Sequence, residues 1–252
     1  LLETNTSEWV DVYLKNNFGQ GNAGKPVFKA SFKPSFHIAK EPLKAVPQAV
    51  NPLIVGVDNG LQAAAVVTQQ DMRGRVNLLA EAYVPEDTTM GFETFLDRIL
   101  IPTLTSKFPS FPKSSIVFVM DPACWARAQL NEKTLAMAVS SRGYHTIKAS
   151  TNDPERRVQA VEGLLARQID GGPGFLIDPT CTYIAEAMEW GFRYKNSTAG
   201  GLAFDKSMHH NHIADALQYA CLHYNAVAPG ARWDQRTRAR PIKKAPYVYA
   251  HA

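Results

Sequence analysis

Two strongly apolar stretches of the sequence each end in an aspartate. Asp58 follows the run 53–57, and Asp121 follows the run 115–120. Such runs are typical of strands buried on both faces of a sheet. Ligands of open α/β sheets bind beyond the carboxyl ends of the strands, so both acids are expected in one crevice. Two carboxylates there favour a bound divalent cation, although each aspartate also begins a sequence typical of a turn.

A third acid, Asp215, lies on the last predicted helix, residues 212–225. This helix is apolar on two faces, which indicates that it is buried. Asp215 shares one face with Tyr219, and His212 lies about one turn away. A buried acid requires a metal ion or an arginine partner. His212 is interpreted as an accessory ligand or an orienting residue, with a purely structural histidine as the alternative.

The elements that must position these acids follow from hydrophobic periodicity. Three strands come first, with a hairpin turn at 71–75 between the second and the third, and helices then alternate with strands. This order predicts an α/β fold with a mixed central sheet, in which a three-strand antiparallel meander is joined by parallel strands and helices cover both faces. The predicted strands are 53–57, 63–68, 76–84, 115–120 and 145–149, the hairpin is 192–204, and the helices are 90–107, 130–142, 153–169, 184–188 and 212–225.

Three segments are expected along the chain. Residues 1–50 contain recurrent prolines and predict an extended N-terminal arm or linker. Residues 51–228 hold all the regular elements. Residues 229–252 form a basic C-terminal tail, in which the stretch 232–244 carries six cations and one anion. The net charge of the whole chain is +4, so the rest is close to neutral. The tail is interpreted either as a polyanion-binding segment or as a solubilising end.

Composition excludes several classes of protein. The 252 residues are 45% hydrophobic and 20% charged, which is ordinary for a globular chain. No apolar run reaches the roughly 18 residues of a membrane span, and no signal peptide is evident. The three cysteines are too few and too widely spaced for a disulfide framework or a metal motif, so they are predicted to be small buried side chains.

Four stretches in this order resemble the C-terminal nuclease domain of the large terminase subunit, the genome-packaging motor of tailed bacteriophages. They are VGVDNGLQAAAVVTQ, VFVMDPA, TNDPERRVQAVEGLL and HIADALQYA. The resemblance covers about residues 26–226. It implies a ribonuclease-H-like fold for the domain 51–228 and a metal-dependent endonuclease that cleaves double-stranded, concatemeric viral DNA.

The resemblance also implies the site. Asp58, Asp121 and Asp215 match the family's three catalytic, metal-binding acids, and His212 matches the histidine of its last helix. They would hold two Mg²⁺ or Mn²⁺ ions, with Asp58 bridging the pair. The implied partners are double-stranded DNA, the motor's ATPase half, the portal and the small terminase subunit. The implied location is the cytoplasm of the infected bacterial host.

Further residues are candidates for accessory roles. Glu81 interrupts the apolar third strand, and Glu93 lies on the first long helix, where some relatives place an extra acid; a surface position is the alternative for Glu93. Five cations lie in or beside elements that the resemblance places near the cleft. Phosphate contacts there would position DNA without reading its sequence, although a solvated surface explains each cation equally well. They are Arg156, Arg157, Arg193, Lys195 and Lys206.

The family's ATPase half has no counterpart in the stretches that carry the resemblance, so we expect an isolated nuclease domain with its preceding linker, unable to hydrolyse ATP by itself. Residues 19–25 match the G-x4-G-K pattern of a P-loop, but Pro26 stands where a metal-binding hydroxyl is needed. Three alternatives to a terminase nuclease remain: another ribonuclease-H-like nuclease of the resolvase or transposase type, an actin-like or sugar-kinase-like ATP-binding protein, and a catalytically inactive DNA-binding module. The second requires a further glycine-rich phosphate hairpin, which Asp121-Pro122-Ala123 is not.

Overall fold

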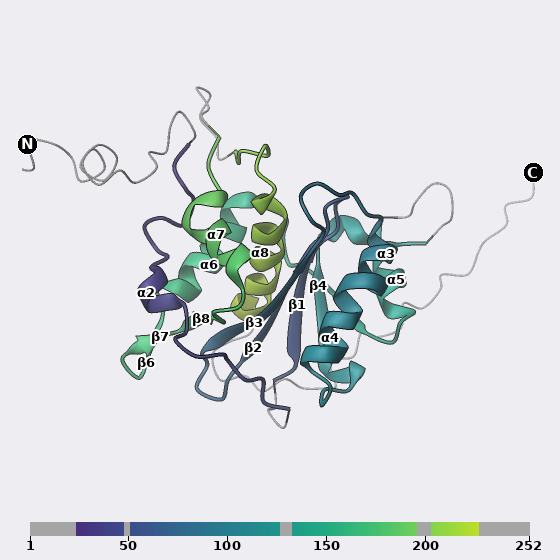
Figure 1. Cartoon of the computed structure of the whole chain (residues 1–252), viewed down its shortest axis with the longest axis horizontal. Helices are drawn as coiled ribbons and strands as arrows, with labels where there is room; N and C mark the ends of the chain where they lie inside the picture. The colour runs from purple at the N-terminus through teal and green to yellow at the C-terminus, as the bar shows by residue number, and fades with distance from the viewer. Residues whose placement is uncertain (1–23, 48–50, 127–132, 196–202, 227–252) are drawn as a thin grey trace, which may run out of the picture.

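A central sheet with helices on both faces forms the body of the protein (Figure 1). The computed structural model describes residues 24–47, 51–126, 133–195 and 203–226. The main sheet has six strands in the order β5-β4-β1-β2-β3-β8. They are β1 Leu53–Asp58, β2 Ala64–Gln70, β3 Val76–Tyr83, β4 Ile116–Met120, β5 His145–Lys148 and β8 Phe175–Ile177. A separate two-stranded hairpin pairs β6 Gln168–Ile169 with β7 Gly172–Pro173.

The sheet is mixed. Strands β1, β2 and β3 form an antiparallel meander, whereas β4 pairs with β1, β5 with β4, and β8 with β3 in parallel. In the turn between β2 and β3, Gly74 adopts a φ of 93°, which glycine tolerates without strain. The mixed sheet and the meander predicted from the sequence are therefore confirmed.

Helices divide between the two faces of the sheet, as Figure 1 shows. One face carries α6, α7 and α8 and the other carries α3, α4 and α5, each over its own apolar core. None of the described helices is both long and apolar enough to cross a lipid bilayer. The helical segments are α2 Pro34–His37, α3 Phe92–Phe95, η1 Leu96–Leu100, α4 Ile101–Lys107, η2 Lys113–Ser115, η3 Pro122–Trp125, α5 Leu135–Ser140, α6 Pro154–Leu165, α7 Thr182–Glu186, η4 Ala187–Gly191 and α8 His210–Ala226.

Helix α8 lies directly against β1 at Gly56. A Cβ at this glycine would stand 2.1 Å from the carbonyl oxygen of Ala216, so no larger residue fits without moving the helix. The three cysteines are free and buried, as the sequence predicted. The close approach of α8 fixes the height of the helix above the strand, and it therefore fixes which of its side chains reach the carboxyl end of β1.

Some elements differ from their predicted bounds. The helix predicted over 153–169 ends at Leu165, because the chain turns there into the β6–β7 hairpin, with Asp170 and Gly171 at positive φ. Strand β8 was not predicted, since three residues are too few to show a period. The helix predicted over 130–142 is described only as α5, Leu135–Ser140, and residues 130–132 lie outside the described ranges. The tip of the predicted hairpin 192–204 also lies outside them.

The N-terminal stretch was expected to be an extended arm over residues 1–50, but its described part, residues 24–47, packs against the sheet domain. Val27, Phe28 and Phe32 are buried within the same core as α6 and α8. The prolines fit because this segment contributes no strand to the main sheet, where a proline would remove a hydrogen bond of the ladder. Residues 1–23 and the basic tail 229–252 lie outside the described residues.

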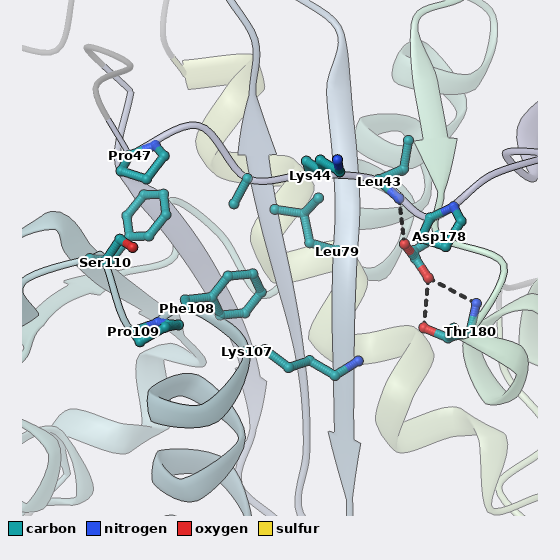
Figure 2. Close-up of a pocket in the computed structure, with 13 residues that line it drawn as sticks. Leu43, Lys44, Pro47, Leu79, Lys107, Phe108, Pro109, Ser110, Asp178 and Thr180 are labelled. Atoms are coloured by element: carbon teal, nitrogen blue, oxygen red, sulfur yellow. Dashed lines mark hydrogen bonds between the residues drawn. The ribbon is translucent and has the colours of Figure 1, made fainter.

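A cavity of about 470 Å³ lies where residues 42–47 cross between β3 and the end of α4. Figure 2 shows Asp178 beside it, with its carboxylate accepting hydrogen bonds from the backbone N–H of Leu43, 2.7 Å away, and from Thr180. These contacts tie the N-terminal segment to the end of β8. None of the three predicted site aspartates lines this cavity.

Candidate metal centre

Asp58 and Asp121 lie side by side at the carboxyl edge of the sheet. In the parallel pairing of β1 and β4, Val57 is opposite Met120, and each aspartate is the next residue of its chain. Asp121 also caps η3, because its Oδ1 accepts a hydrogen bond from the N–H of Ala123 at 2.6 Å. Burial, assisted by the negative charges of Asp121 and Asp58, raises the pKa of the Cys124 thiol to about 12. The two carboxylates are therefore close enough for both negative charges to affect the same neighbouring side chain.

Helix α8 brings His212, Asp215 and Tyr219 over this edge. Their spacing of three and four residues puts them on one face of the helix. His212 Nδ1 is 2.7 Å from Asp58 Oδ2. This hydrogen bond is the main cause of the raised pKa of His212. The contact joins the N-terminal turn of α8 to the end of β1.

Asp215 is half-buried in the first turns of α8. Burial raises the pKa of its carboxyl to about 6, the positive charge of Arg157 opposes this rise, and the negative charge of Asp58 adds to it. Arg157 Nη2 lies 3.3 Å from Asp215 Oδ1, and Gln218 Nε2 donates to the same oxygen at 3.1 Å. Asp215 therefore has the arginine partner that a buried acid needs, and it still experiences the charge of Asp58.

Asp121 is held by two residues that the sequence alone does not assign to the site. The Tyr219 hydroxyl is 2.5 Å from Asp121 Oδ2, and Asn152 Nδ2 donates to the same oxygen at 3.2 Å. Tyr219 in turn accepts a hydrogen bond from Arg157 Nη1 at 2.9 Å. Its position on the same helix face as Asp215 is visible in the sequence, but an aromatic residue there is interpreted as core.

The donor set suits a hard divalent cation in its chemistry. Three carboxylates lie beside one guanidinium and one imidazole, so the local charge is negative even when His212 is protonated. Carboxylate oxygens are the preferred ligands of such cations. The described residues contain no group of three or more His, Cys, Asp or Glu side chains already arranged around one point as metal ligands. Each carboxylate turns to a protein partner instead: Asp58 to His212, Asp121 to Tyr219, and Asp215 to Arg157.

The two glutamates predicted as accessory acids have structural partners. Glu81 accepts hydrogen bonds from the N–H groups of Tyr183 and Ile184, at 3.1 and 2.8 Å, and so caps the start of α7. Burial raises the pKa of its carboxyl. Glu93 pairs with Arg142 at 3.3 Å, on the outer surface of α3. The hydrogen bonds and the ion pair of these two glutamates involve other residues than the three aspartates.

The five cations predicted to contact DNA differ in how exposed their side chains are. Arg156, Lys195 and Lys206 are exposed, and the positive charge of Lys206 acts on both His212 and Asp215. Arg193 is half-buried, with its guanidinium over the Trp190 ring at 6.0 Å. Arg157 is only 6% exposed, so its predicted place on a DNA-facing surface is wrong. The helix turns it inward to Asp215.

Comparison with known proteins finds solved structures that share this fold. No protein-family model and no curated protein matches the sequence. The large terminase of a thermophilic bacteriophage aligns with a TM-score of 0.56 at 14% identity, covering 86% of this chain and 51% of that one. The chain thus spans about half the length of that terminase. The P22 large terminase nuclease domain aligns with a TM-score of 0.56 at 13% identity, covering 81% and 94%. This chain has a ribonuclease-H-like fold, the one found in the nuclease domains of large terminases.

Proposed function

We propose that this protein is a metal-dependent endonuclease that cleaves double-stranded DNA, and that it cuts a concatemeric viral genome during packaging. The observation that carries the proposal is the register of β1 and β4. It sets Asp58 and Asp121 next to each other at one sheet edge, and α8 brings Asp215 over that edge. The fold shared with large terminase nuclease domains supports the same function.

The three aspartates are proposed to hold two Mg²⁺ or Mn²⁺ ions. Asp58 interacts with both His212 and Asp215, and all three acids would supply carboxylate oxygens to the ions. When bound, such ions stabilise the attacking and leaving oxygens of a phosphodiester. Metal binding requires Asp121 and Asp215 to share their oxygens with Tyr219 and Arg157, and His212 keeps Asp58 oriented.

The exposed cations are proposed to position the duplex. Among these cations, Lys206 has an electrostatic effect on the site itself, since its charge lowers the pKa of both His212 and Asp215. Arg156 projects from the first turn of α6, and Lys195 and Arg193 lie near the start of the hairpin that follows η4. Phosphate contacts by these side chains would set the orientation of the DNA without selecting a sequence.

The partners are proposed on the basis of length and fold. The large terminase of the thermophilic bacteriophage, of which this chain covers 52%, was crystallised in complex with ADP. We propose that this nuclease works with an ATP-hydrolysing part of a packaging motor, with a portal and with a small terminase subunit. The proposed location is the cytoplasm of an infected bacterium.

A plasmid-nicking assay tests the proposed function. The purified protein is incubated with supercoiled DNA and Mn²⁺ or Mg²⁺, and nicked and linear products are expected. EDTA is expected to stop the reaction. Cleavage that persists unchanged in EDTA, or its absence with either metal, contradicts the proposal.

Single substitutions of the acids test the site. Asp58→Asn, Asp121→Asn and Asp215→Asn are each expected to reduce cleavage to background, because each removes a charged oxygen ligand. Asp87→Asn serves as the control, since Asp87 is an exposed aspartate in the loop after β3. Circular dichroism checks that the variants remain folded. Full activity in one of the three removes that acid from the site.

A further inference from the structure

A hydrogen-bonded bridge joins Asp121 to Asp215 through Tyr219 and Arg157. Arg157 contacts Asp215 Oδ1 at 3.3 Å and the Tyr219 oxygen at 2.9 Å. Tyr219 then contacts Asp121 Oδ2 at 2.5 Å. The bridge connects three elements distant in sequence: α6, α8 and the end of β4. We refer to Arg157 and Tyr219 as the bridge.

The direction of each hydrogen bond follows from the chemistry of the groups. A guanidinium has only donors, so the Tyr219 oxygen accepts from Arg157. The single hydroxyl proton is then free to point to Asp121, whose Oδ2 is closer than the Asn152 amide oxygen at 3.0 Å. Burial and the hydrogen bond to Asp121 raise the pKa of Tyr219, which keeps the phenol protonated as a donor.

Neither bridge residue is free to turn to solvent. Tyr219 is 1% exposed and Arg157 is 6% exposed, and the guanidinium lies over the tyrosine ring at 5.1 Å. This stacking and the burial fix the position of the hydroxyl. Arg157 is thus too enclosed to bind a phosphate, and its contacts lie within the acid group.

Asp121 is held from both of its oxygens. Oδ1 accepts from the N–H of Ala123, and Oδ2 is fixed by Tyr219 and by Asn152 Nδ2. The Ala123 contact alone explains the cap of η3. The contacts to Oδ2 are not needed for that cap, and they set the rotation of the carboxylate about its own axis.

We infer that Tyr219 is a positioning residue: its hydroxyl, itself oriented by Arg157, acts with Asn152 to hold the Asp121 carboxylate in the orientation that binds metal. The inference rests on the proposed function of the site. Groups that orient a metal ligand typically change metal affinity or activity by roughly 10- to 100-fold when removed.

The test uses Tyr219→Phe in the full chain, because this change removes only the hydroxyl and keeps the ring beneath Arg157. Mn²⁺ binding is measured by isothermal titration calorimetry, and initial plasmid-nicking rates are measured over a range of Mn²⁺ concentrations. We expect Tyr219→Phe to need roughly 10- to 100-fold more Mn²⁺ for half-saturation in both measurements.

Tyr224→Phe is the matched control. Tyr224 lies on the same helix and is also buried, but its hydroxyl contacts Thr68 Oγ1 at 2.8 Å, in the core. This variant also loses one buried hydroxyl, so it shows the cost to folding alone. Its Mn²⁺ midpoint is expected to equal that of the wild type.

The outcomes separate the two proposals. A wild type that neither binds Mn²⁺ nor cleaves DNA overturns the function. A wild type that does both, with a Tyr219→Phe midpoint equal to that of Tyr224→Phe, overturns the positioning role alone. If Tyr219→Phe does not fold, Asn152→Ala at its exposed position removes the other donor to Asp121 Oδ2. A raised midpoint in that variant supports the inference, and an unchanged one overturns it.

Discussion

His212 and Asp58 form a pair that depends on the absence of a neighbouring side chain. A Cβ at Gly60 would lie 3.3 Å from His212 Cε1, closer than ordinary van der Waals contact. With glycine there, the imidazole approaches Asp58 to 2.7 Å from its own Nδ1. The turn Asp58-Asn59-Gly60, which alone suggested a simple bend, also makes room for the histidine.

His212→Ala is expected to lower the Mn²⁺-dependent nicking rate by roughly 10- to 100-fold, because Asp58 loses the group that orients it. The measurement is the initial rate at a fixed Mn²⁺ concentration. His209→Ala is the control, since His209 Nδ1 contacts the amide oxygen of Gln62 at 2.7 Å rather than an acid of the site. Equal rates for the two variants would show that His212 has only a structural role.

The sequence reveals some site residues and hides others for physical reasons. Asp58 and Asp121 are recognisable because a charged residue ends each apolar run. Tyr219 looks like core because its hydroxyl partner, Asp121, is 98 residues away. Arg156 and Arg157 are adjacent, and successive residues of a helix point about 100° apart, so only the packing of α6 decides which one is buried.

At the scale of elements, the site depends on how closely α8 approaches β1. Gly56→Ala is expected to destabilise the protein by about 1–3 kcal/mol or more, because its Cβ would meet the backbone of α8. Urea unfolding measures the change. Gly163→Ala is the matched control: a Cβ there meets nothing within 4 Å, and alanine is favoured over glycine in a helix by about 1 kcal/mol. The prediction fails if Gly56→Ala is as stable as the wild type.

Strands that are buried along their whole length can be predicted from the sequence, whereas elements of only a few residues cannot. Strands β1 and β4 are buried along nearly their whole length, so their apolar pattern identifies them. Strand β8 has three residues, and it exists because it pairs with Val76–Leu78 of β3. The N-terminal segment shows no periodicity, yet Phe28 is fully buried, because its ring stacks on Phe192 within the core that α6 and α8 share.

At the scale of the whole molecule, the N-terminal segment is joined to α6 by His37. The N–H of Lys33 donates to His37 Nδ1 at 2.9 Å, so that nitrogen carries no proton. Nε2 therefore carries the proton and donates to the carbonyl of Leu165 at 3.1 Å. Burial lowers the pKa of His37, opposed by these backbone bonds, and the charge of Lys33 lowers it further. The folded protein thus favours neutral His37.

The lowered pKa of His37 predicts a pH dependence of stability. Below a pH of about 6.5 the unfolded chain binds a proton at His37 that the folded chain resists, so the free energy of unfolding falls as the pH falls. Above that pH the residue contributes no slope. Thermal unfolding of the wild type and of His37→Gln is compared between about pH 5 and pH 8. Glutamine at position 37 does not titrate, so the variant is expected to lose less stability on acidification than the wild type. Parallel plots of stability against pH for the two proteins would contradict this.

The distribution of charge over the whole chain leads to the last prediction. The stretch 232–244 carries six cations and one anion, whereas the rest of the chain is close to neutral. If the tail binds DNA phosphates, deletion from Arg232 onward weakens binding and reduces the slope of log affinity against log salt by up to about 5, since each phosphate contact contributes about 0.9. Fluorescence anisotropy with a DNA duplex measures both quantities.

The control for the tail is Arg156→Ala, which removes one exposed cation of the domain and is expected to change the slope by about 1. The tail deletion keeps the acids and α8, so metal-dependent nicking at low salt is expected to survive while its salt sensitivity falls. An unchanged slope after deletion would assign DNA binding to the domain surface alone, with Lys206 and Arg156 as its strongest candidates, because both are exposed and the charge of Lys206 acts on Asp215.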